Sequence, residues 1–396
     1  MKKEIRKIGI VTGGGDCSGL NAVINGITKA AVTKYGLEVV GFTKGFSGLI
    51  ENAHRDLDLK AVSGILHEGG TILKSSNKDN LFNYRVRDDE GKYVNKDVSD
   101  EAVRNLEYLG VDALIVIGGD GTLTSARDFS RKGIPVIGVP KTIDNDLPGT
   151  DVTFGFNTSL ETICDALDKI HTTAFSHDRV MVVEVMGRMT GWLALEGGFA
   201  GSADVIIIPE IPYDINKIVA KINQRDAFGR NFTIIIVSEG ATPIGGDLTV
   251  RETVEDSPDT VRLGGIGAVI TQQLHNLVPN HEVRYTNLAY LQRGGVTSQF
   301  DRALGLMFGV EAVELLMQGK SGVMVQLIGR DITNIPLEEI VGNGEVGETS
   351  KGGKKQVDPK GQMVQSAKAI GISFGDWSCI LIQLILIYIL LMKQYF

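Results

Sequence analysis

Three aspartates, a lysine and several glycines follow two short apolar segments near the middle of the chain. Residues 113–117 (ALIVI) lead into residues 118–122 (GGDGT), and residues 136–139 (VIGV) lead into residues 140–146 (PKTIDND). Carboxylates bind divalent cations, and glycine turns allow backbone amides to approach phosphates closely. These residue types are therefore suited to the chemistry of phosphate groups together with a divalent metal ion.

Parallel strands are the elements that would position these residues. Short apolar runs bounded by glycine and proline are typical of strands covered on both faces. In open α/β sheets, ligands bind outside the carboxyl ends of such strands. The pattern predicts that residues 113–117 and 136–139 are buried strands, and that their ends bring Asp120, Lys141 and Asp144 to one edge of a sheet.

Another glycine-rich turn lies near the amino end of the chain. Residues 8–11 (IGIV) lead into residues 12–19 (TGGGDCSG), and apolar residues then recur at helical spacing from Leu20 to Ala31. Such a strand, turn and helix can bind an anion through backbone amides and the helix amino end. The signal is weak by itself, because close packing also requires glycine and because no Gly-Lys-Ser/Thr of a P-loop follows.

Alternating strand and helix patterns run from residue 8 to residue 140 and resume from about residue 156. This alternation predicts α/β domains with mostly parallel sheets, and a length of 396 residues suits two of them. At the start of the second domain, Thr158 and Glu161 have the spacing of a helix capping box.

Composition excludes several classes of function. The net charge is −8 and no long basic run is present, which argues against nucleic acid and anionic membranes as partners. Three cysteines without CxxC spacing indicate a reducing compartment and neither a disulfide framework nor a structural zinc site. The apolar run at residues 8–11 is too short for a signal peptide. We therefore expect a cytoplasmic protein.

Four arginines stand near predicted strand or loop ends: Arg179, Arg188, Arg284 and Arg293. The planar guanidinium group binds a phosphate monoester with two parallel hydrogen bonds. An isolated arginine more often forms a surface ion pair, but these four recur beside glycine turns. They are candidates for binding a phosphorylated substrate.

Five motifs in this order resemble the 6-phosphofructokinase family: residues 14–16 (GGD), 118–122 (GGDGT), 142–146 (TIDND), 185–188 (VMGR) and 292–295 (QRGG). The resemblance runs from about residue 7 to residue 376. It implies two Rossmann-like, three-layer α/β domains with mostly parallel sheets and an interdomain active-site cleft, usually in a homo-oligomer. The implied activity is glycolytic transfer of a phosphoryl group from MgATP to the 1-hydroxyl of fructose 6-phosphate, which gives fructose 1,6-bisphosphate and ADP.

The resemblance also implies a division of the chain. Residues 1–155 with about 266–318 would form the phosphoryl-donor domain, and residues 156–265 with about 319–335 would form the fructose 6-phosphate domain. Residues 336–376 would be a C-terminal extension, within which the Gly- and Lys-rich residues 341–362 are expected to form a flexible loop. The apolar tail at 377–396 lies outside the family pattern. Its apolar part is shorter than the roughly 17 to 25 residues that cross a bilayer, so packing on the protein or disorder is favoured over a membrane anchor.

By the same resemblance, Asp144 would accept the proton of the sugar 1-hydroxyl, Thr142 would orient the substrate, and Arg188 would contribute both charge and binding. Asp120 would hold Mg²⁺, with Asp146 as a further candidate partner of the metal. The donor would be bound by Gly14, Gly15, Gly119, Asp120, Gly121, Thr122 and Lys141. The sugar pocket would contain Thr142, Ile143, Asp144, Met186, Gly187, Arg188, Glu239, Tyr290, Leu291, Gln292 and Arg293. Arg179 and Arg284 would grip the sugar 6-phosphate from a neighbouring subunit.

The phosphoryl donor depends on two positions. In the family, glycine at the position of Gly121 accompanies ATP, whereas an aspartate there marks pyrophosphate enzymes. Lysine at the position of Lys141 occurs in pyrophosphate enzymes and also in a mixed group that uses ATP. The pair favours ATP and leaves pyrophosphate as the alternative donor.

Two asparagines depart from the family pattern. Asn77 stands where many members carry an arginine that reaches the donor and product phosphates, so that charge would come from Lys74, Lys78 or Lys141. Asn25 replaces an arginine of the regulatory nucleotide site, so we do not expect that regulation here.

The departure at Asn77 also leaves a catalytically silent regulatory subunit as a second hypothesis, against which the intact Asp120, Asp144 and Arg188 argue. The GGDGT motif also occurs in lipid and NAD kinases. The hypothesis of such a kinase would leave residues 144–146, Arg188 and Arg293 unexplained.

Overall fold

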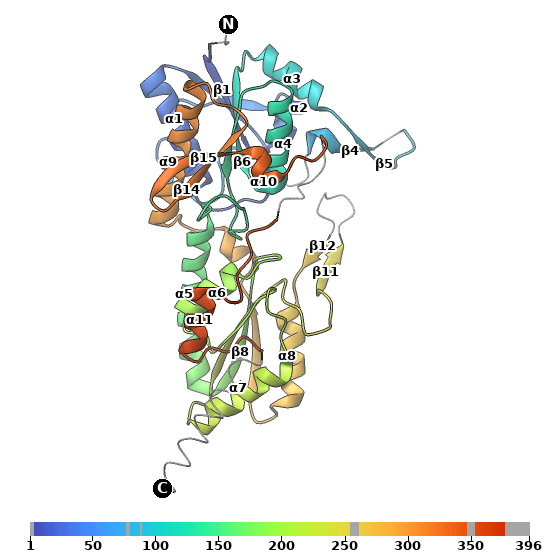
Figure 1. Cartoon of the computed structure of the whole chain (residues 1–396), viewed down its shortest axis with the longest axis vertical. Helices are drawn as coiled ribbons and strands as arrows, with labels where there is room; N and C mark the ends of the chain where they lie inside the picture. The colour runs from blue at the N-terminus through green and yellow to red at the C-terminus, as the bar shows by residue number, and fades with distance from the viewer. Residues whose placement is uncertain (1–3, 77–79, 88, 254–260, 347–352, 377–396) are drawn as a thin grey trace. The chain divides into compact units, whose positions relative to one another are not determined.

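The computed structural model describes residues 4–76, 80–87, 89–253, 261–346 and 353–376. The chain folds into two compact units (Figure 1). Among the described residues, the first unit comprises those between 4 and 159 and between 293 and 355, and the second comprises 160–253, 261–292 and 356–376.

A seven-stranded sheet forms the centre of the first unit, with the strand order β15-β14-β7-β6-β1-β2-β3. Its strands are β1 (Lys7–Thr12), β2 (Glu38–Phe42), β3 (His54–Asp56), β6 (Ala113–Gly118), β7 (Val136–Pro140), β14 (Val323–Ile328) and β15 (Asp331–Pro336). The five central strands are parallel, and the edge strands β3 and β15 are antiparallel to their neighbours. The two predicted strands at 113–117 and 136–139 are therefore confirmed as the neighbours β6 and β7.

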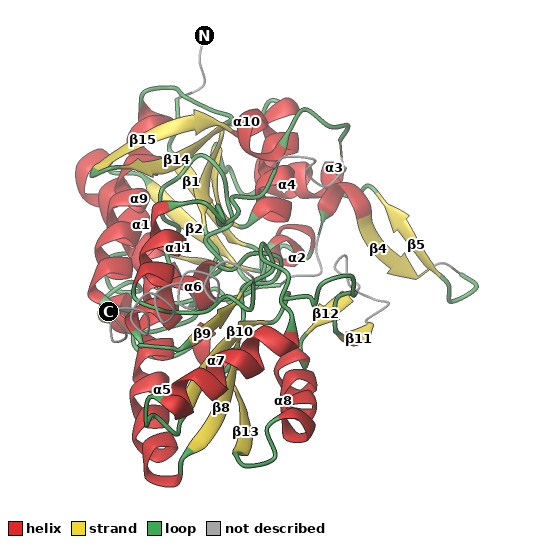
Figure 2. Cartoon of the chain, turned by 60° about the horizontal axis from the view of Figure 1, so that its bottom comes forward, coloured by secondary structure: helices red, strands yellow, loops and turns green. Residues whose placement is uncertain are grey.

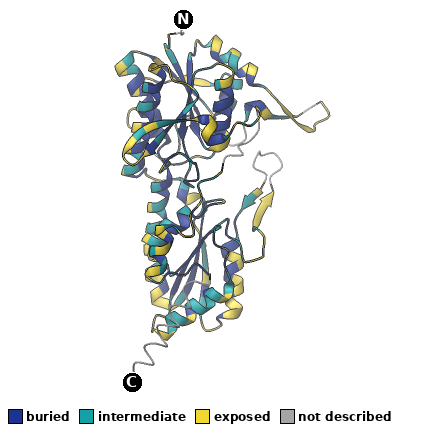
Figure 3. Ribbon diagram, in the orientation of Figure 1, coloured by how far each residue is buried: buried dark blue, intermediate teal, exposed yellow. Residues whose placement is uncertain are grey.

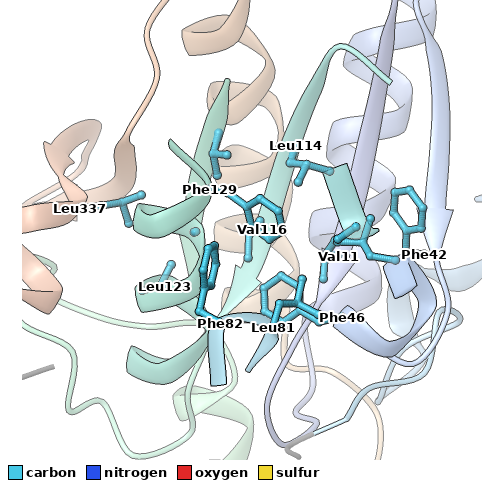
Figure 4. Packing of buried hydrophobic residues seen from close by; sticks show 14 of the residues in the cluster. Val11, Phe42, Phe46, Leu81, Phe82, Leu114, Val116, Leu123, Phe129 and Leu337 are labelled. Atoms are coloured by element: carbon cyan, nitrogen blue, oxygen red, sulfur yellow. The ribbon is translucent and has the colours of Figure 1, made fainter. Parts of the chain in front are cut away.

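Helices cover both faces of this sheet (Figure 2). One face carries α1 (Leu20–Tyr35) and α9 (Gln299–Met317), and the other carries α2 (Phe46–Ile50), α3 (Ser99–Tyr108), α4 (Asp120–Arg131) and α10 (Leu337–Val341). Between the second face and its helices, Val116 and Leu114 pack with Phe46, Leu123 and Phe129 in a fully enclosed apolar core (Figure 4). All six residues of β6 are buried, as its continuous apolar sequence predicts for a strand covered on both sides.

The second unit is also a three-layer structure. Its parallel sheet has the order β13-β8-β10-β9, formed by β8 (Arg179–Val185), β9 (Val205–Ile207), β10 (Thr233–Ser238) and β13 (Glu282–Asn287). The helices of this unit are α5 (Phe156–His177), which begins in the first unit, α6 (Trp192–Ala200), α7 (Ile215–Ala227), α8 (Ile266–Leu277) and α11 (Gln362–Ala369). The dark inner layer in Figure 3 contains the apolar residues of β8, β9 and β10, whereas exposed residues, drawn in yellow, lie on the outer helix faces.

Short elements complete the chain. Single 3₁₀ turns occur at Ile65–His67, Leu81–Asn83 and Ala289–Arg293. Two antiparallel hairpins pair β4 (Tyr84–Arg87) with β5 (Tyr93–Lys96) and β11 (Val250–Thr253) with β12 (Val261–Leu263). Every residue of β5 is exposed, so the polar stretch from 83 to 96 is the surface excursion that its composition predicts.

The predicted division of the chain is wrong in two places. Residues 319–335 were assigned to the sugar domain, but β14 pairs with β7, and it lies in the first unit together with β15. Residues 266–292, assigned to the donor domain, form α8 and β13 of the second unit, because β13 pairs with β8 along its whole length. Apolar runs predict a strand without specifying which sheet that strand joins.

Two local predictions also need correction. The helix expected after Thr158 already begins at Phe156, so Thr158 is not its cap. Instead, Asp301 of α9 accepts hydrogen bonds from the Thr158 backbone nitrogen (2.7 Å) and from Thr158 Oγ1 (2.6 Å). The stretch at 341–362 is not wholly a flexible loop, because Arg127 donates to the Gly342 carbonyl (2.7 Å) and the Lys355 backbone nitrogen donates to the Asp146 carbonyl (2.9 Å).

The apolar tail at 377–396 lies outside the described residues, so its predicted packing stays a prediction. Within the part of the chain that the structure describes, no helix is both long enough and apolar enough to cross a membrane.

Candidate active site

The glycine turn after β1 lines a pocket in the first unit. A depression of about 450 Å³ is bounded by Gly14, Gly15, Asp16, Thr71, Lys74, Ser75 and Ser76. The Gly14 nitrogen donates to the Ser76 carbonyl (2.9 Å), and Ser75 Oγ donates to the Thr12 carbonyl (3.1 Å). These bonds join the glycine turn to residues 75 and 76, which lie beside it. Lys74 gives the pocket a cationic side chain.

Close neighbours explain the glycines of this turn. Gly14 has a φ of +79°, in the left-handed region that disfavours other residues. A Cβ atom on Gly13 would lie 2.6 Å from the Thr122 methyl group, and one on Gly15 would lie 2.7 Å from Arg293 Nη1. The turn therefore packs directly on Thr122 of α4, and Arg293 lies against it.

Asp120 begins α4 at the carboxyl end of β6. Its side chain is exposed, and Oδ1 accepts a hydrogen bond from the Gly121 nitrogen at 2.8 Å. Among the described residues, no three His, Cys, Asp or Glu side chains gather in a way that could hold a metal ion. Mg²⁺ usually binds one or two carboxylates together with substrate phosphates, so a single exposed aspartate fits this ion.

Lys141 connects the end of β7 to the glycine turn. Its side chain is buried, with 4% of the residue exposed, and its Nζ donates to the Gly15 carbonyl. Burial lowers the pKa of Lys141, and the adjacent Arg293 lowers it further, while Cys17, Asp144 and Asp16 oppose the shift. The same enclosure raises the pKa of the Cys17 thiol to about 12, mainly by burial. Lys141 thus places a cation directly beneath the turn.

The residues that follow Lys141 form a folded loop that presents Asp144. The Asp144 nitrogen donates to Thr142 Oγ1 (3.1 Å), and Thr153 Oγ1 donates to the Thr142 carbonyl (2.7 Å). Asn145 has a left-handed backbone (φ 51°), and its Oδ1 accepts a hydrogen bond from the Thr153 nitrogen (3.2 Å). Asp144 itself is half-buried.

A second group of predicted site residues lies at the carboxyl ends of β8 and β10 in the second unit. The Met186 nitrogen donates to Gln292 Oε1 (2.9 Å), and the Arg188 nitrogen donates to Glu239 Oε1 (3.0 Å). Gly187 (φ 132°) and Arg188 (φ 51°) both have positive φ values. Tyr290 and Leu291 are exposed by 72% and 67%. The structure thus brings Met186, Gly187, Arg188, Glu239 and Gln292 together.

Arg179 and Arg284 lie elsewhere in the same unit. Arg179 is the first residue of β8, at the end opposite Met186. Its Nε donates to Glu282 Oε2 (2.5 Å), and Glu282 also accepts a hydrogen bond from Arg284. The two guanidinium groups hold the pKa of the Glu282 carboxyl below its usual range, first through the Arg179 hydrogen bond. Both arginines share one carboxylate. Arg179 lies at the end of β8 opposite Met186, and Arg284 is paired with Met181, the third residue of β8.

The structure also locates further residues around the predicted site. Arg293, predicted for the sugar pocket, donates from Nη1 to the Asp16 carbonyl (3.1 Å) in the first unit. Asn77 and Lys78 lie outside the described residues. Lys354, which sequence reasoning missed, pairs with Asp146 at 2.6 Å. The only sequence signal is the lysine-rich composition of its segment, and such composition predicts a loop and not an ion pair.

Glycine turns, carboxylates and lysines at the carboxyl ends of parallel strands define an α/β protein built to bind phosphate groups. Residues 7–316 match the family model for phosphofructokinase. The chain belongs to the phosphofructokinase family.

Similar proteins agree on this family. The chain is 58% identical to the ATP-dependent 6-phosphofructokinase 2 of Clostridium perfringens, over 95% of this chain and 100% of that protein. It is 46% identical to the ATP-dependent 6-phosphofructokinase of Chloroflexus aurantiacus, over 95% of this chain and 99% of the relative.

Solved structures show the same architecture. Phosphofructokinase from Pichia pastoris in the T-state aligns with a TM-score of 0.70 and 31% identity, covering 85% of this chain and 35% of that longer chain. A pyrophosphate-dependent phosphofructokinase from Marinobacter aquaeolei aligns with a TM-score of 0.71 over 93% of this chain and 92% of that one. Its identity is 21%, so it supports the fold alone.

Proposed function

We propose that this chain is an ATP-dependent 6-phosphofructokinase, which transfers the terminal phosphoryl group of ATP to the 1-hydroxyl of fructose 6-phosphate. The products are fructose 1,6-bisphosphate and ADP, as in glycolysis. The observation that carries the proposal is the 58% identity with an enzyme named for this activity over that enzyme's whole length. A relative with 46% identity is named for ATP as well, so ATP is the favoured donor.

In the proposed reaction, Asp144 accepts the proton from the sugar 1-hydroxyl as that oxygen attacks the γ-phosphorus of ATP. The new O–P bond forms while the bond from the γ-phosphorus to the bridging oxygen breaks, and the electron pair leaves with ADP. Thr142 orients the substrate, and because its Oγ1 accepts a hydrogen bond from the Asp144 nitrogen, it also helps to orient the base. Arg188 stabilises the negative charge of the transferred group.

The donor is assigned to the pocket beside the glycine turn. Gly14, Gly15, Gly119, Gly121 and Thr122 allow close approach of its phosphates, and Lys74 and Lys141 supply positive charge. We propose that Asp120 holds Mg²⁺ there. The chemistry that a bound Mg²⁺ supplies is neutralisation of charge on the donor phosphates.

The sugar 6-phosphate is assigned to Arg179 and Arg284 of a neighbouring copy of the chain. The support is the position of Arg179, because seven residues separate it from Met186, about 23 Å at roughly 3.3 Å per residue, and Arg284 shares Glu282 with Arg179. A single hexose phosphate bound at Arg188 would not span that distance within one chain. The proposal therefore includes a homo-oligomer in which each copy completes a site of another.

The proposed function is tested by steady-state kinetics of the purified full-length chain with fructose 6-phosphate and Mg²⁺. We expect kcat/KM with ATP to exceed that with pyrophosphate by at least about 100-fold, equivalent to about 2.7 kcal/mol of transition-state stabilisation. Comparable rates with both donors, or faster turnover with pyrophosphate, would remove ATP as the assigned donor. Absence of turnover with either donor would favour the silent regulatory subunit.

A further inference from the structure

Residues 354 and 355 bind the segment that follows the proposed base. Lys354 Nζ donates to Asp146 Oδ2 at 2.6 Å, and the Lys355 backbone nitrogen donates to the Asp146 carbonyl at 2.9 Å. Lys355 Nζ donates to the Thr150 carbonyl (3.2 Å) and also to the Asp151 carbonyl. Both the side chain and the main chain of Asp146 are therefore held by this part of the C-terminal extension, within the first unit.

The ion pair between Lys354 and Asp146 is not an ordinary surface pair. The Asp146 side chain is only 11% exposed, whereas that of Lys354 is 29% exposed. Exposed pairs contribute little to stability, but a largely buried carboxylate is costly unless a cation and hydrogen bonds compensate for its lost hydration. Lys354 supplies that cation, and it comes from a residue 208 positions away in the sequence.

The position of the pair links it to the reaction. Asp146 follows Asp144 by two residues in the loop whose Asn145 has a left-handed backbone. Without Lys354, a largely buried carboxylate two residues from the proposed base would lack a compensating cation, and the loop would lose the side-chain ion pair that holds Asp146 on the extension. A shift of a reacting group by about 1 Å can cost about 100-fold in rate.

We infer that Lys354 is a positioning residue for phosphoryl transfer, which acts by pairing with Asp146 and so fixes the charge and the backbone of the loop that carries Asp144. This inference rests on the proposed function. It assigns a catalytic contribution to the C-terminal extension, which the motif-based reading of the chain did not include.

Kinetics of Lys354→Met and Lys354→Arg in the full-length chain test this inference. We expect Lys354→Met to lower kcat by about tenfold to 100-fold, while KM for fructose 6-phosphate changes by less than about threefold. Lys354→Arg should recover most of the lost turnover, because a guanidinium group also pairs with a carboxylate. The matched control is Lys360→Met, which removes an exposed lysine of the same extension and should behave like the wild type.

A double-mutant cycle with Asp146→Asn distinguishes an effect of Lys354 through Asp146 from an independent effect on turnover. If Lys354 acts through Asp146, Lys354→Met should cause little further loss in the Asp146→Asn background, whereas independent effects would multiply. Wild-type turnover in Lys354→Met, or full multiplication in the cycle, would overturn the inference. Thermal unfolding of each variant identifies a folding defect, and Lys354→Gln, judged by the same criteria, replaces a variant that does not fold. An inactive wild-type chain would instead overturn the proposed function itself, and the role of Lys354 with it.

Discussion

Asp144 is held by its neighbours in a way that suits a proton acceptor. Its backbone nitrogen is fixed by Thr142 Oγ1 at 3.1 Å, and Thr142 is in turn fixed by Thr153 at 2.7 Å. A general base must lie within hydrogen-bond reach of the proton it accepts, so a rigid loop contributes directly to the rate. This loop is where the proposed chemistry depends most on a single side chain.

Replacing Asp144 tests its proposed role as the base most simply. We expect Asp144→Ser to lower kcat by about 100-fold to 10,000-fold, because serine cannot accept the hydroxyl proton effectively at neutral pH. Binding of fructose 6-phosphate, measured by isothermal titration calorimetry, should remain within a few-fold of the wild type. Asp165→Ser, which changes an exposed aspartate of α5, is the control. Near-normal turnover in Asp144→Ser would remove the base from the account.

Gly121 determines the donor in the proposed function, and its surroundings permit a clean substitution. A Cβ atom at this position would have nothing within 4 Å, so an aspartate fits the fold without a clash inside the chain. We expect Gly121→Asp to reduce kcat/KM for ATP by at least about 100-fold through repulsion of the nucleotide phosphates, with an unchanged melting temperature. Gly121→Ala controls for the loss of glycine. Unchanged ATP kinetics in Gly121→Asp would contradict the argument.

At the scale of helices and strands, the sequence predicted the site-bearing framework because apolar runs and glycine turns are local signals. β1, β6 and β7 lie where those runs predicted them, and their ends bring the glycine turn, Asp120 and Lys141 into one unit. Contacts between residues far apart in the sequence were not predicted. The local capping pattern at Thr158 did not predict the hydrogen bond that its backbone nitrogen donates to Asp301. The lysine-rich composition around Lys354 did not predict its ion pair with Asp146.

The Asp301 contact makes a testable contribution to stability. Asp301 is fully buried, and its carboxylate accepts two hydrogen bonds from Thr158 near the start of α5. Asp301→Ala would leave both donors without this acceptor, and we expect it to lower the free energy of unfolding by about 1–3 kcal/mol. Urea unfolding would show this as a lower midpoint at a similar slope. Asp165→Ala, at an exposed position of α5, should change the midpoint little, and an equally small change in Asp301→Ala would show that the contact is dispensable.

For the whole molecule, the central expectation is that copies of the chain share sites. Arg179 and Arg284 gather around Glu282 at one end of the second sheet, and Met186 and Arg188 lie at the other end. Two ends of one strand cannot bind the same hexose phosphate within a chain. The arrangement is explained if the arginines of one copy serve the sugar pocket of another.

Subunit complementation tests this sharing. Arg179→Ala and Asp144→Ser should each be nearly inactive alone, because every site in either oligomer carries a defect. When the two variants are co-expressed with different affinity tags and mixed oligomers are purified, some sites carry both defects and others carry none, so activity should recover well above both parents. Arg330→Ala, at an exposed position on the turn between β14 and β15, serves as the control and should be active alone. Mixed oligomers without recovered activity would place Arg179 and Asp144 in the same site of one chain.

The most direct test of the central claim is identification of the products. The purified chain would be incubated with Mg²⁺, ATP and fructose 6-phosphate, and the reaction followed by ³¹P nuclear magnetic resonance. We predict that ADP and a new phosphate monoester at C1 of the sugar appear in equal amounts. Release of inorganic phosphate without a phosphorylated C1, or phosphorylation at another position, would contradict the proposed function.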